Sequence, residues 1–140
     1  MRIGGIEVTG TARLAPMAGI SNAPFRQVAR DCGSGLTTSE EIDAISLVRG
    51  SDVAREIARF YPAERPLAMQ LLGCDAGLLV RAAAQLQEAG AGIIDLNMGC
   101  PMPKITKQGK GAALMRDVPA TAALLAALRR AVSVPFTVKI

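Results

Sequence analysis

The chain alternates between short apolar runs and longer segments with helical spacing, and this alternation restricts its fold more than any other feature. Each apolar run has the length of one strand and is bounded by Gly, Pro or polar residues. Strands joined by helical connections pair in parallel, because a parallel pair requires a long crossover. The alternation therefore predicts an α/β fold with about five parallel strands, at 13–16, 36–39, 67–72, 93–97 and 136–140.

The segments between these strands carry the residue types that begin and end helices. Polar caps and an early proline mark helix starts, and glycine marks helix ends. We expect helices from Ser21 or Asn22, with Pro24 in the first turn, to Gly33; over 42–60, with a break near 50–52; from Asp75 to Gly90; and from Asp117 over 118–132.

Polar side chains stand at the ends of four predicted strands: Glu40, Gln70, Asn97 and Lys139. The carboxyl ends of parallel strands share one edge, which is the catalytic face of a (β/α)₈ TIM barrel. A doubly wound open sheet would also place ligands there. A complete barrel takes roughly 250 residues. We therefore expect 1–140 to form the N-terminal part of a barrel that is truncated before its last strands.

Composition excludes several classes of function. Hydrophobic residues make up 50% of the chain but aromatic residues only 3%, which suits aliphatic strands packed under Ala-rich helices. Histidine is absent, and this excludes a Ser-His-Asp triad, a Cys-His pair and a histidine-ligated metal within the segment. The three cysteines are odd in number and widely spaced, so neither a metal site nor a disulfide framework is expected.

No apolar run approaches the ~20 residues that span a bilayer, and the N-terminus has no apolar segment of signal-peptide length. We therefore expect a cytoplasmic location and no membrane partner. The formal charge of +4 suits either an ordinary surface or an anionic partner such as nucleic acid. Lys104, Lys107 and Lys110 follow Cys100 with no acidic residue between them, and this favours a phosphate-bearing substrate.

Cys100 is the candidate catalytic residue, although a free cysteine is most often a small buried hydrophobic side chain. It follows a polar strand end and precedes Pro101. A thiol with a pKa of about 8.5 is mostly protonated at neutral pH and can donate a proton. Because no histidine is present to activate it, the sequence favours a general acid over an acylated nucleophile.

Other strand-end residues fit a planar, anionic cofactor, and each also has a structural interpretation. Lys139 either extends to water or lies against a reduced flavin. Gln70 and Asn97 could hydrogen-bond the edge of a heterocycle or tie strands together. The turn 16–19 has small side chains that let a flat ring approach, with Met17 packing on it, but a compact βα turn has the same composition.

Together these segments resemble the N-terminal portion of the tRNA-dihydrouridine synthases, most of all the bacterial B-type branch. The segment Asn-Met-Gly-Cys-Pro at 97–101 is the most specific. The matching segments occur in family order across the chain: 15–19 with 24–26, 70–73, 95–101 with Lys104, 111–115 and 138–140.

The resemblance implies an FMN-dependent oxidoreductase on a TIM barrel that reduces the C5–C6 double bond of uridines in tRNA, with NADPH as reductant. It implies that Cys100 protonates C5 and that Asn97 and Lys104 contact the substrate. It also implies that further barrel strands and a helical tRNA-binding domain follow the segment 1–140. The positions that match FMN contacts are Pro16, Met17, Ala18, Gln70 and Lys139.

Two other interpretations stay open at this point. A dihydroorotate-dehydrogenase-like FMN barrel also acts on a pyrimidine, but it would have Asn after the Cys-Pro pair, where this chain has Met102. An inactive half-barrel is the second. In an incomplete barrel the first and fifth strands each present an unpaired edge, so self-association is expected.

Overall fold

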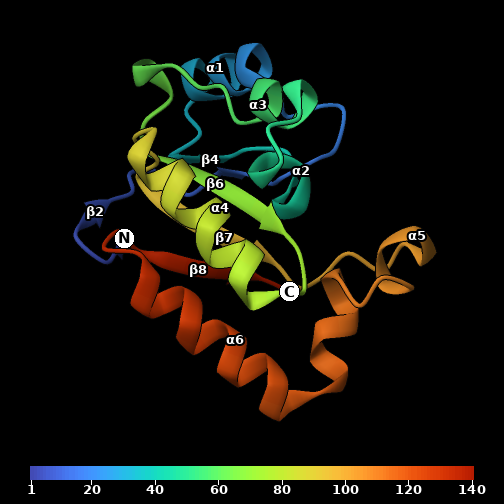
Figure 1. Ribbon diagram of the computed structural model, residues 1–140. Helices are drawn as coiled ribbons and strands as arrows, with labels where there is room; N and C mark the ends of the chain where they lie inside the picture. Colours follow the sequence, from blue (N-terminus) through green and yellow to red (C-terminus); the bar gives the residue numbers. More distant parts are fainter.

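The predicted parallel sheet is present in the computed structural model, which describes residues 1–140. Its strands pair in parallel in the order β3-β4-β6-β7-β8. The result is an α/β half-barrel (Figure 1), which confirms the predicted class and the five-strand sheet. The strands are β3 (Arg13–Leu14), β4 (Leu36–Thr38), β6 (Leu67–Leu72), β7 (Ile93–Asn97) and β8 (Phe136–Lys139).

Helices α4 and α6 cover one face of the sheet, while α1 and α3 lie toward its β4 side (Figure 1). The predicted caps are confirmed: Asn22, Asp75 and Asp117 each accept a backbone N–H in the first turn. None of the helices combines the length and apolar character needed to traverse a membrane. The helices are α1 (Ala23–Asp31), α2 (Ala44–Val48), α3 (Asp52–Ile57), α4 (Ala76–Glu88), α5 (Pro103–Thr106) and α6 (Val118–Ala131), with 3₁₀ turns η1 (Pro62–Glu64) and η2 (Gly111–Arg116).

Two short pieces of extended chain were not predicted. The expectation of helix from residue 42 is wrong, because β5 (Ile42–Asp43) first pairs with the carboxyl end of β6. Asp43 then caps α2 by accepting the Ser46 N–H at 3.0 Å. An antiparallel hairpin of β1 (Arg2–Ile3) and β2 (Ile6–Glu7) lies at the opposite end of the sheet from α5 (Figure 1).

The core lies between the sheet and the helices α4 and α6. Leu79 of α4 and Leu128 of α6 are 0% exposed, and the same holds for Met69, Ile94 and Leu96 of the strands. Fully burying such a side chain contributes about 1.5–3 kcal/mol. This packing holds the central strands rigidly, so the loops at their carboxyl ends start from a fixed base.

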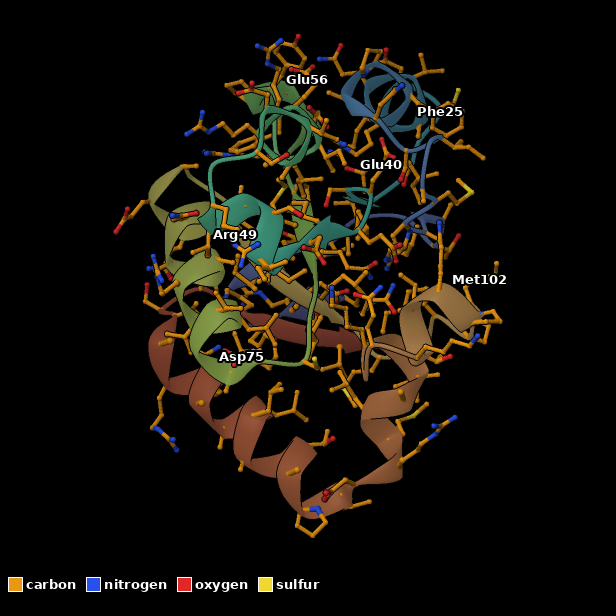
Figure 2. The ribbon with its side chains drawn as sticks, turned by 45° about the vertical axis from the view of Figure 1, so that its right-hand side comes forward. Phe25, Glu40, Arg49, Glu56, Asp75 and Met102 are labelled. Atoms are coloured by element: carbon orange, nitrogen blue, oxygen red, sulfur yellow. The ribbon has the colours of Figure 1, made fainter.

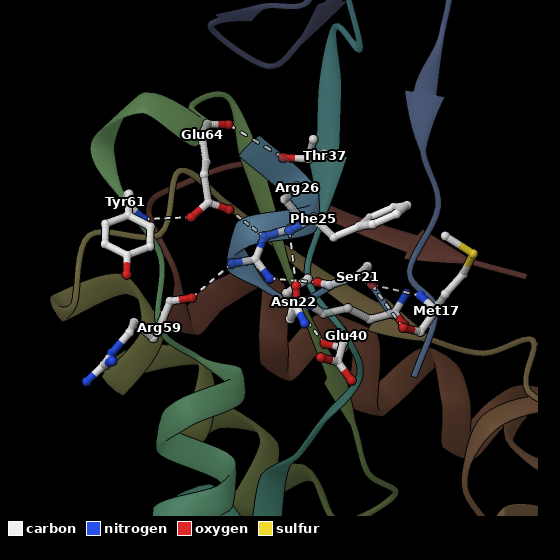
Figure 3. Close-up of polar contacts among 12 residues, drawn as sticks. Met17, Ser21, Asn22, Phe25, Arg26, Thr37, Glu40, Arg59, Tyr61 and Glu64 are labelled. Carbon is white, nitrogen blue, oxygen red and sulfur yellow. Dashed lines mark hydrogen bonds and ion pairs between the residues drawn. The ribbon is translucent and has the colours of Figure 1, made fainter. Parts of the chain in front are cut away.

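A buried ion pair joins α1 to η1 (Figure 3). The Arg26 guanidinium donates to Glu64 at 2.5 Å, to the Ser21 carbonyl at 2.8 Å and to the Arg59 carbonyl at 2.9 Å. The Tyr61 N–H donates to the other Glu64 oxygen at 2.7 Å. Both charged residues are 0% exposed. We call these five residues the Arg26–Glu64 network; its charges are neutralised within the protein.

Candidate functional site

A cleft of about 360 Å³ lies at the carboxyl ends of the strands. The segment with Cys100, α5 and η2 forms a lobe beyond these ends (Figure 1), and Met102 stands on it (Figure 2). Eight residues were assigned a catalytic role or a cofactor or substrate contact from the sequence, and the cleft brings together six of them: Pro16, Ala18, Asn97, Cys100, Lys104 and Lys139.

The sheet is curled enough for its two edge strands to reach the same site. Pro16 follows the edge strand β3, and Lys139 belongs to β8 at the other edge. Both also line an adjoining side pocket of about 250 Å³, together with Asp95. Curvature of this kind places the ends of all the strands around one space, as in a barrel.

The backbone around Cys100 is held from two sides. The Asn97 side-chain oxygen accepts the N–H groups of Gly99 at 3.1 Å and Cys100 at 3.0 Å. The Cys100 carbonyl accepts the N–H of Ala112 at 3.0 Å. Gly111 has φ +60°, and a Cβ there would lie 2.6 Å from the Cys100 oxygen. The half-buried thiol therefore sits on a constrained turn.

Gln70 and Met17 do not line the cleft. Gln70 is 0% exposed; its carbonyl oxygen accepts from Asn97 at 3.2 Å, and its NH₂ donates to Asp95 at 2.7 Å. In this structure the Gln70 side chain thus ties β6 to β7. Of the two interpretations that the sequence allows for Gln70, contact with a heterocycle or a tie between strands, the structure shows the tie. The Met17 backbone closes a turn with the Ser21 hydroxyl, through bonds of 2.9 and 3.1 Å.

The three lysines that follow Cys100 are not equivalent. Lys104 and Lys107 are exposed, but the Lys110 ammonium binds Asp43 at 2.5 Å. Burial acts to raise the pKa of Asp43, but hydrogen bonds from Lys110 and Ser46 outweigh it, and the pKa lies below its usual value. Of the three lysines noted in the sequence, Lys110 is therefore paired within the protein, where it ties the lobe to α2.

Sequence reasoning missed Glu41, the one carboxylate that lines the cleft. It accepts the Asn97 NH₂ at 3.0 Å. Burial raises the pKa of Glu41 above its usual value. The positive charge of Lys104 opposes this rise, and the negative charge of Asp43 adds to it. Its neighbour Glu40 faces another pocket and accepts the Gly19 N–H. No periodicity distinguishes two successive glutamates, so only the fold could show which one enters the cleft.

Asp95 was likewise not singled out, and it lies buried beneath the site. It accepts from Gln70 at 2.7 Å and from the Thr137 hydroxyl at 2.5 Å. Burial raises the pKa of Asp95, while these two hydrogen bonds and the charge of Lys139 oppose the rise. A thiol, two cations and the half-buried Glu41 thus line one cleft, with the buried Asp95 in the adjoining pocket and the pKa of both carboxyls raised, an arrangement typical of functional sites.

Comparisons with known proteins agree with this geometry. Residues 13–140 match the family model described as dihydrouridine synthase. The chain is 39% identical over 140 residues to tRNA-dihydrouridine synthase B of Pseudomonas aeruginosa, covering 100% of this chain and 42% of the relative. It is 36% identical over 140 residues to a probable tRNA-dihydrouridine synthase of Rickettsia bellii, covering 99% and 43%.

The chain therefore spans less than half the length of these curated relatives. The family match nevertheless covers nearly all of its residues, including every residue that lines the cleft. We conclude that the chain belongs to the dihydrouridine synthase family.

Proposed function

We propose that the chain forms part of an FMN-dependent oxidoreductase that reduces the C5–C6 double bond of uridine in tRNA, with NADPH as reductant and Cys100 as proton donor. The observation that carries the proposal is that Cys100 and Lys139 line one cleft at the carboxyl ends of neighbouring strands. A proton donor and a cation close together suit a reaction in which negative charge develops and a carbon is protonated.

The residues of the cleft fit a flavin. Its volume of about 360 Å³ lies in the usual range of ligand pockets. Pro16 and Ala18 are small enough to let a flat ring approach, and the Lys139 ammonium would stabilise the negative charge of the reduced ring. When bound, FMN supplies the hydride. Glu41 is the one carboxylate there, and burial raises its pKa.

The chain's own groups then have separate tasks. The Asn97 side chain fixes the Cys100 turn, and the thiol on that turn delivers the proton to C5. Lys104 and Lys107 are exposed on the lobe beside the cleft, where ammonium groups bind nucleic-acid phosphates. A target uridine has to leave its base stack to enter such a cleft.

The test uses an extended protein, in which this chain is continued by the C-terminal part of the Pseudomonas aeruginosa relative. We expect it to bind FMN. Cys100→Ala should lower dihydrouridine formation by roughly 10²-fold, the scale for loss of a general acid. NADPH oxidation through the flavin should remain, because that step needs no proton from Cys100.

Cys32→Ala and Cys74→Ala are the matched controls, since both of these thiols are exposed and Cys32 lies outside the cleft. Neither should reduce dihydrouridine formation. An equal loss in all three variants would show that the cysteines matter for folding alone. An extended protein that takes up no added FMN would overturn the cofactor assignment.

A further inference from the structure

Asn97 makes all four hydrogen bonds that a carboxamide can make. Its oxygen accepts from the N–H groups of Gly99 and Cys100, and its NH₂ donates to Glu41 and Gln70. A reversed amide would place its NH₂ against two N–H donors and its oxygen against two acceptors. Whatever fixes the orientation of this amide therefore also fixes the turn that carries the thiol.

The orientation of the Gln70 amide is fixed in turn by Asp95. An ionised carboxylate only accepts hydrogen bonds, so it directs the Gln70 NH₂ toward itself and the Gln70 oxygen toward Asn97. The Thr137 hydroxyl holds the second Asp95 oxygen. Gln70, Asp95 and Thr137 are direct neighbours in register across β6, β7 and β8. Asn97 lies two residues beyond Asp95, on the same face of β7.

We propose that Asp95 is a positioning residue for the Cys100 thiol, acting through Gln70 and Asn97. The inference deepens the proposed function, because the position of the thiol matters for catalysis only if Cys100 is the proton donor. Asp95 is 6% exposed, Gln70 0% and Asn97 9%. Water therefore competes little for these hydrogen bonds, and each amide orientation depends on its neighbour.

Two substitutions separate orientation from charge. Asp95→Asn and Asp95→Leu both remove the negative charge beneath Lys139, and both residues have as many side-chain heavy atoms as Asp, with the same branching. Asn keeps an oxygen for the Gln70 NH₂, and the Thr137 hydroxyl can accept from the new amide instead of donating. Leu offers Gln70 no acceptor, so nothing then holds the Gln70 amide in the orientation that presents its oxygen to Asn97, and Asn97 loses one of the bonds that orient it.

The first measurement is hydrogen exchange of the Gly99 and Cys100 backbone amides by NMR, made on the extended protein and on the 140-residue chain alone. In Asp95→Leu we expect both amides to exchange roughly tenfold faster, the effect of losing a hydrogen bond of ordinary strength. In Asp95→Asn the exchange should stay near that of the unsubstituted protein. The Leu86 amide in α4 serves as a reference for global opening.

The second measurement is the alkylation rate of Cys100 by iodoacetamide across pH, with the exposed Cys32 and Cys74 as internal references. Asp95→Leu should change the pH profile of alkylation at Cys100 and leave those of Cys32 and Cys74 unchanged. In the separate variant Asp95→Asn, the Cys100 profile should match that of the unsubstituted protein. Glu64→Leu is the matched control, because it breaks a buried polar network of which no residue lines the cleft. It should leave the Cys100 profile unchanged even though it lowers stability.

Equal effects of Asp95→Asn and Asp95→Leu would overturn the inference, since the charge alone would then matter. Faster exchange at Leu86 as well as at Gly99 and Cys100 would also overturn it, because Asp95 would then act through global stability. Both readouts are independent of activity. If Asp95→Leu loosens the turn but dihydrouridine formation does not depend on Cys100, the positioning inference stands and the proposed function fails.

Discussion

The molecule contains two buried polar networks, and they differ in the groups at which they end. In the Arg26–Glu64 network the two charged groups bind one another and nearby backbone groups (Figure 3), and both charged residues are 0% exposed. The network that joins Thr137, Asp95, Gln70 and Asn97 instead continues to Glu41 and Cys100 at the cleft.

The difference shows that a buried charge does not by itself mark a site. Glu64 has an arginine within hydrogen-bond distance, whereas the hydrogen bonds of Asp95 and Glu41 come from neutral side chains. Burial raises the pKa of both Asp95 and Glu41. A polar network that is closed on itself contributes stability, whereas one that opens into a cleft at the carboxyl ends of barrel strands has the arrangement typical of functional sites.

The largest expected effect comes from breaking the closed network. Glu64→Leu should lower the free energy of unfolding by about 3–5 kcal/mol, because it leaves the Arg26 guanidinium buried without its partner. The double variant Arg26→Met/Glu64→Leu should recover much of the loss. Urea unfolding of the extended protein measures both. A loss below about 1 kcal/mol for the single variant would show that Arg26 finds water, and that this network is not closed.

The next largest effect is expected at Gly111, which packs against the Cys100 turn. Gly111→Ala should cost about 1–3 kcal/mol, because φ is +60° and the new Cβ would lie 2.6 Å from the Cys100 carbonyl oxygen. Gly111→Ala should also change the alkylation rate of Cys100, whereas Glu64→Leu should leave that rate unchanged. Gly5→Ala is the control, since nothing lies within 4 Å of a Cβ there. Equal urea midpoints for the two variants would contradict the close approach.

A smaller effect is expected where the lobe is tied to α2. Asp43→Asn should cost about 1 kcal/mol at pH 7, the scale of one hydrogen bond, because it keeps the helix cap but loses the charge that binds Lys110. The pKa of Asp43 is lowered by folding. The stability it contributes is therefore present above its ordinary pKa of about 4 and is lost as pH falls through the lower folded value.

Asp75→Asn is the matched control for this tie, because Asp75 also caps a helix but forms no ion pair with a lysine or arginine. Its effect on the urea midpoint at pH 7 should be the smaller of the two. If the two variants behave alike at every pH between 3 and 7, Lys110 adds nothing to the cap.

The smallest effect is expected at Glu41. Because folding raises the pKa of Glu41, its ionised form opposes folding, and this cost grows as pH rises from the ordinary pKa to the raised one. Glu41→Gln should therefore raise the urea midpoint slightly at pH 7 and leave it unchanged below about pH 4. Glu40→Gln is the comparison, since Glu40 lies outside the cleft. A lower midpoint for Glu41→Gln at pH 7 would contradict the sign.

Local signals explain what could be predicted. The strands 67–72 and 93–97 were found because each is a buried apolar run, and the helices of Asp75 and Asp117 because their caps and apolar faces are adjacent in sequence. The two-residue strand β5 was missed, because it has no period of its own and exists only through pairing with β6.

The site was predictable to a similar extent and for a similar reason. Strand ends locate Asn97, Cys100 and Lys139 at one edge of a parallel sheet, and the structure brings them into one cleft. Gln70 ties strands together and does not face the cleft because it binds Asp95. Lys110 is not a free cation because it binds Asp43. These partners lie 25 and 67 positions away in the sequence, beyond the reach of any local pattern.

The curl of the sheet also has a consequence for the order of folding. Strands β6 and β7 pair across one helical connection, but the cleft needs Pro16 and Lys139, which stand near the two ends of the chain. Closing so long a loop is entropically costly, and contacts of this kind form late. We expect the central strands to assemble on the ribosome before the cleft exists, so the nascent chain gains a stable core first and a binding site last.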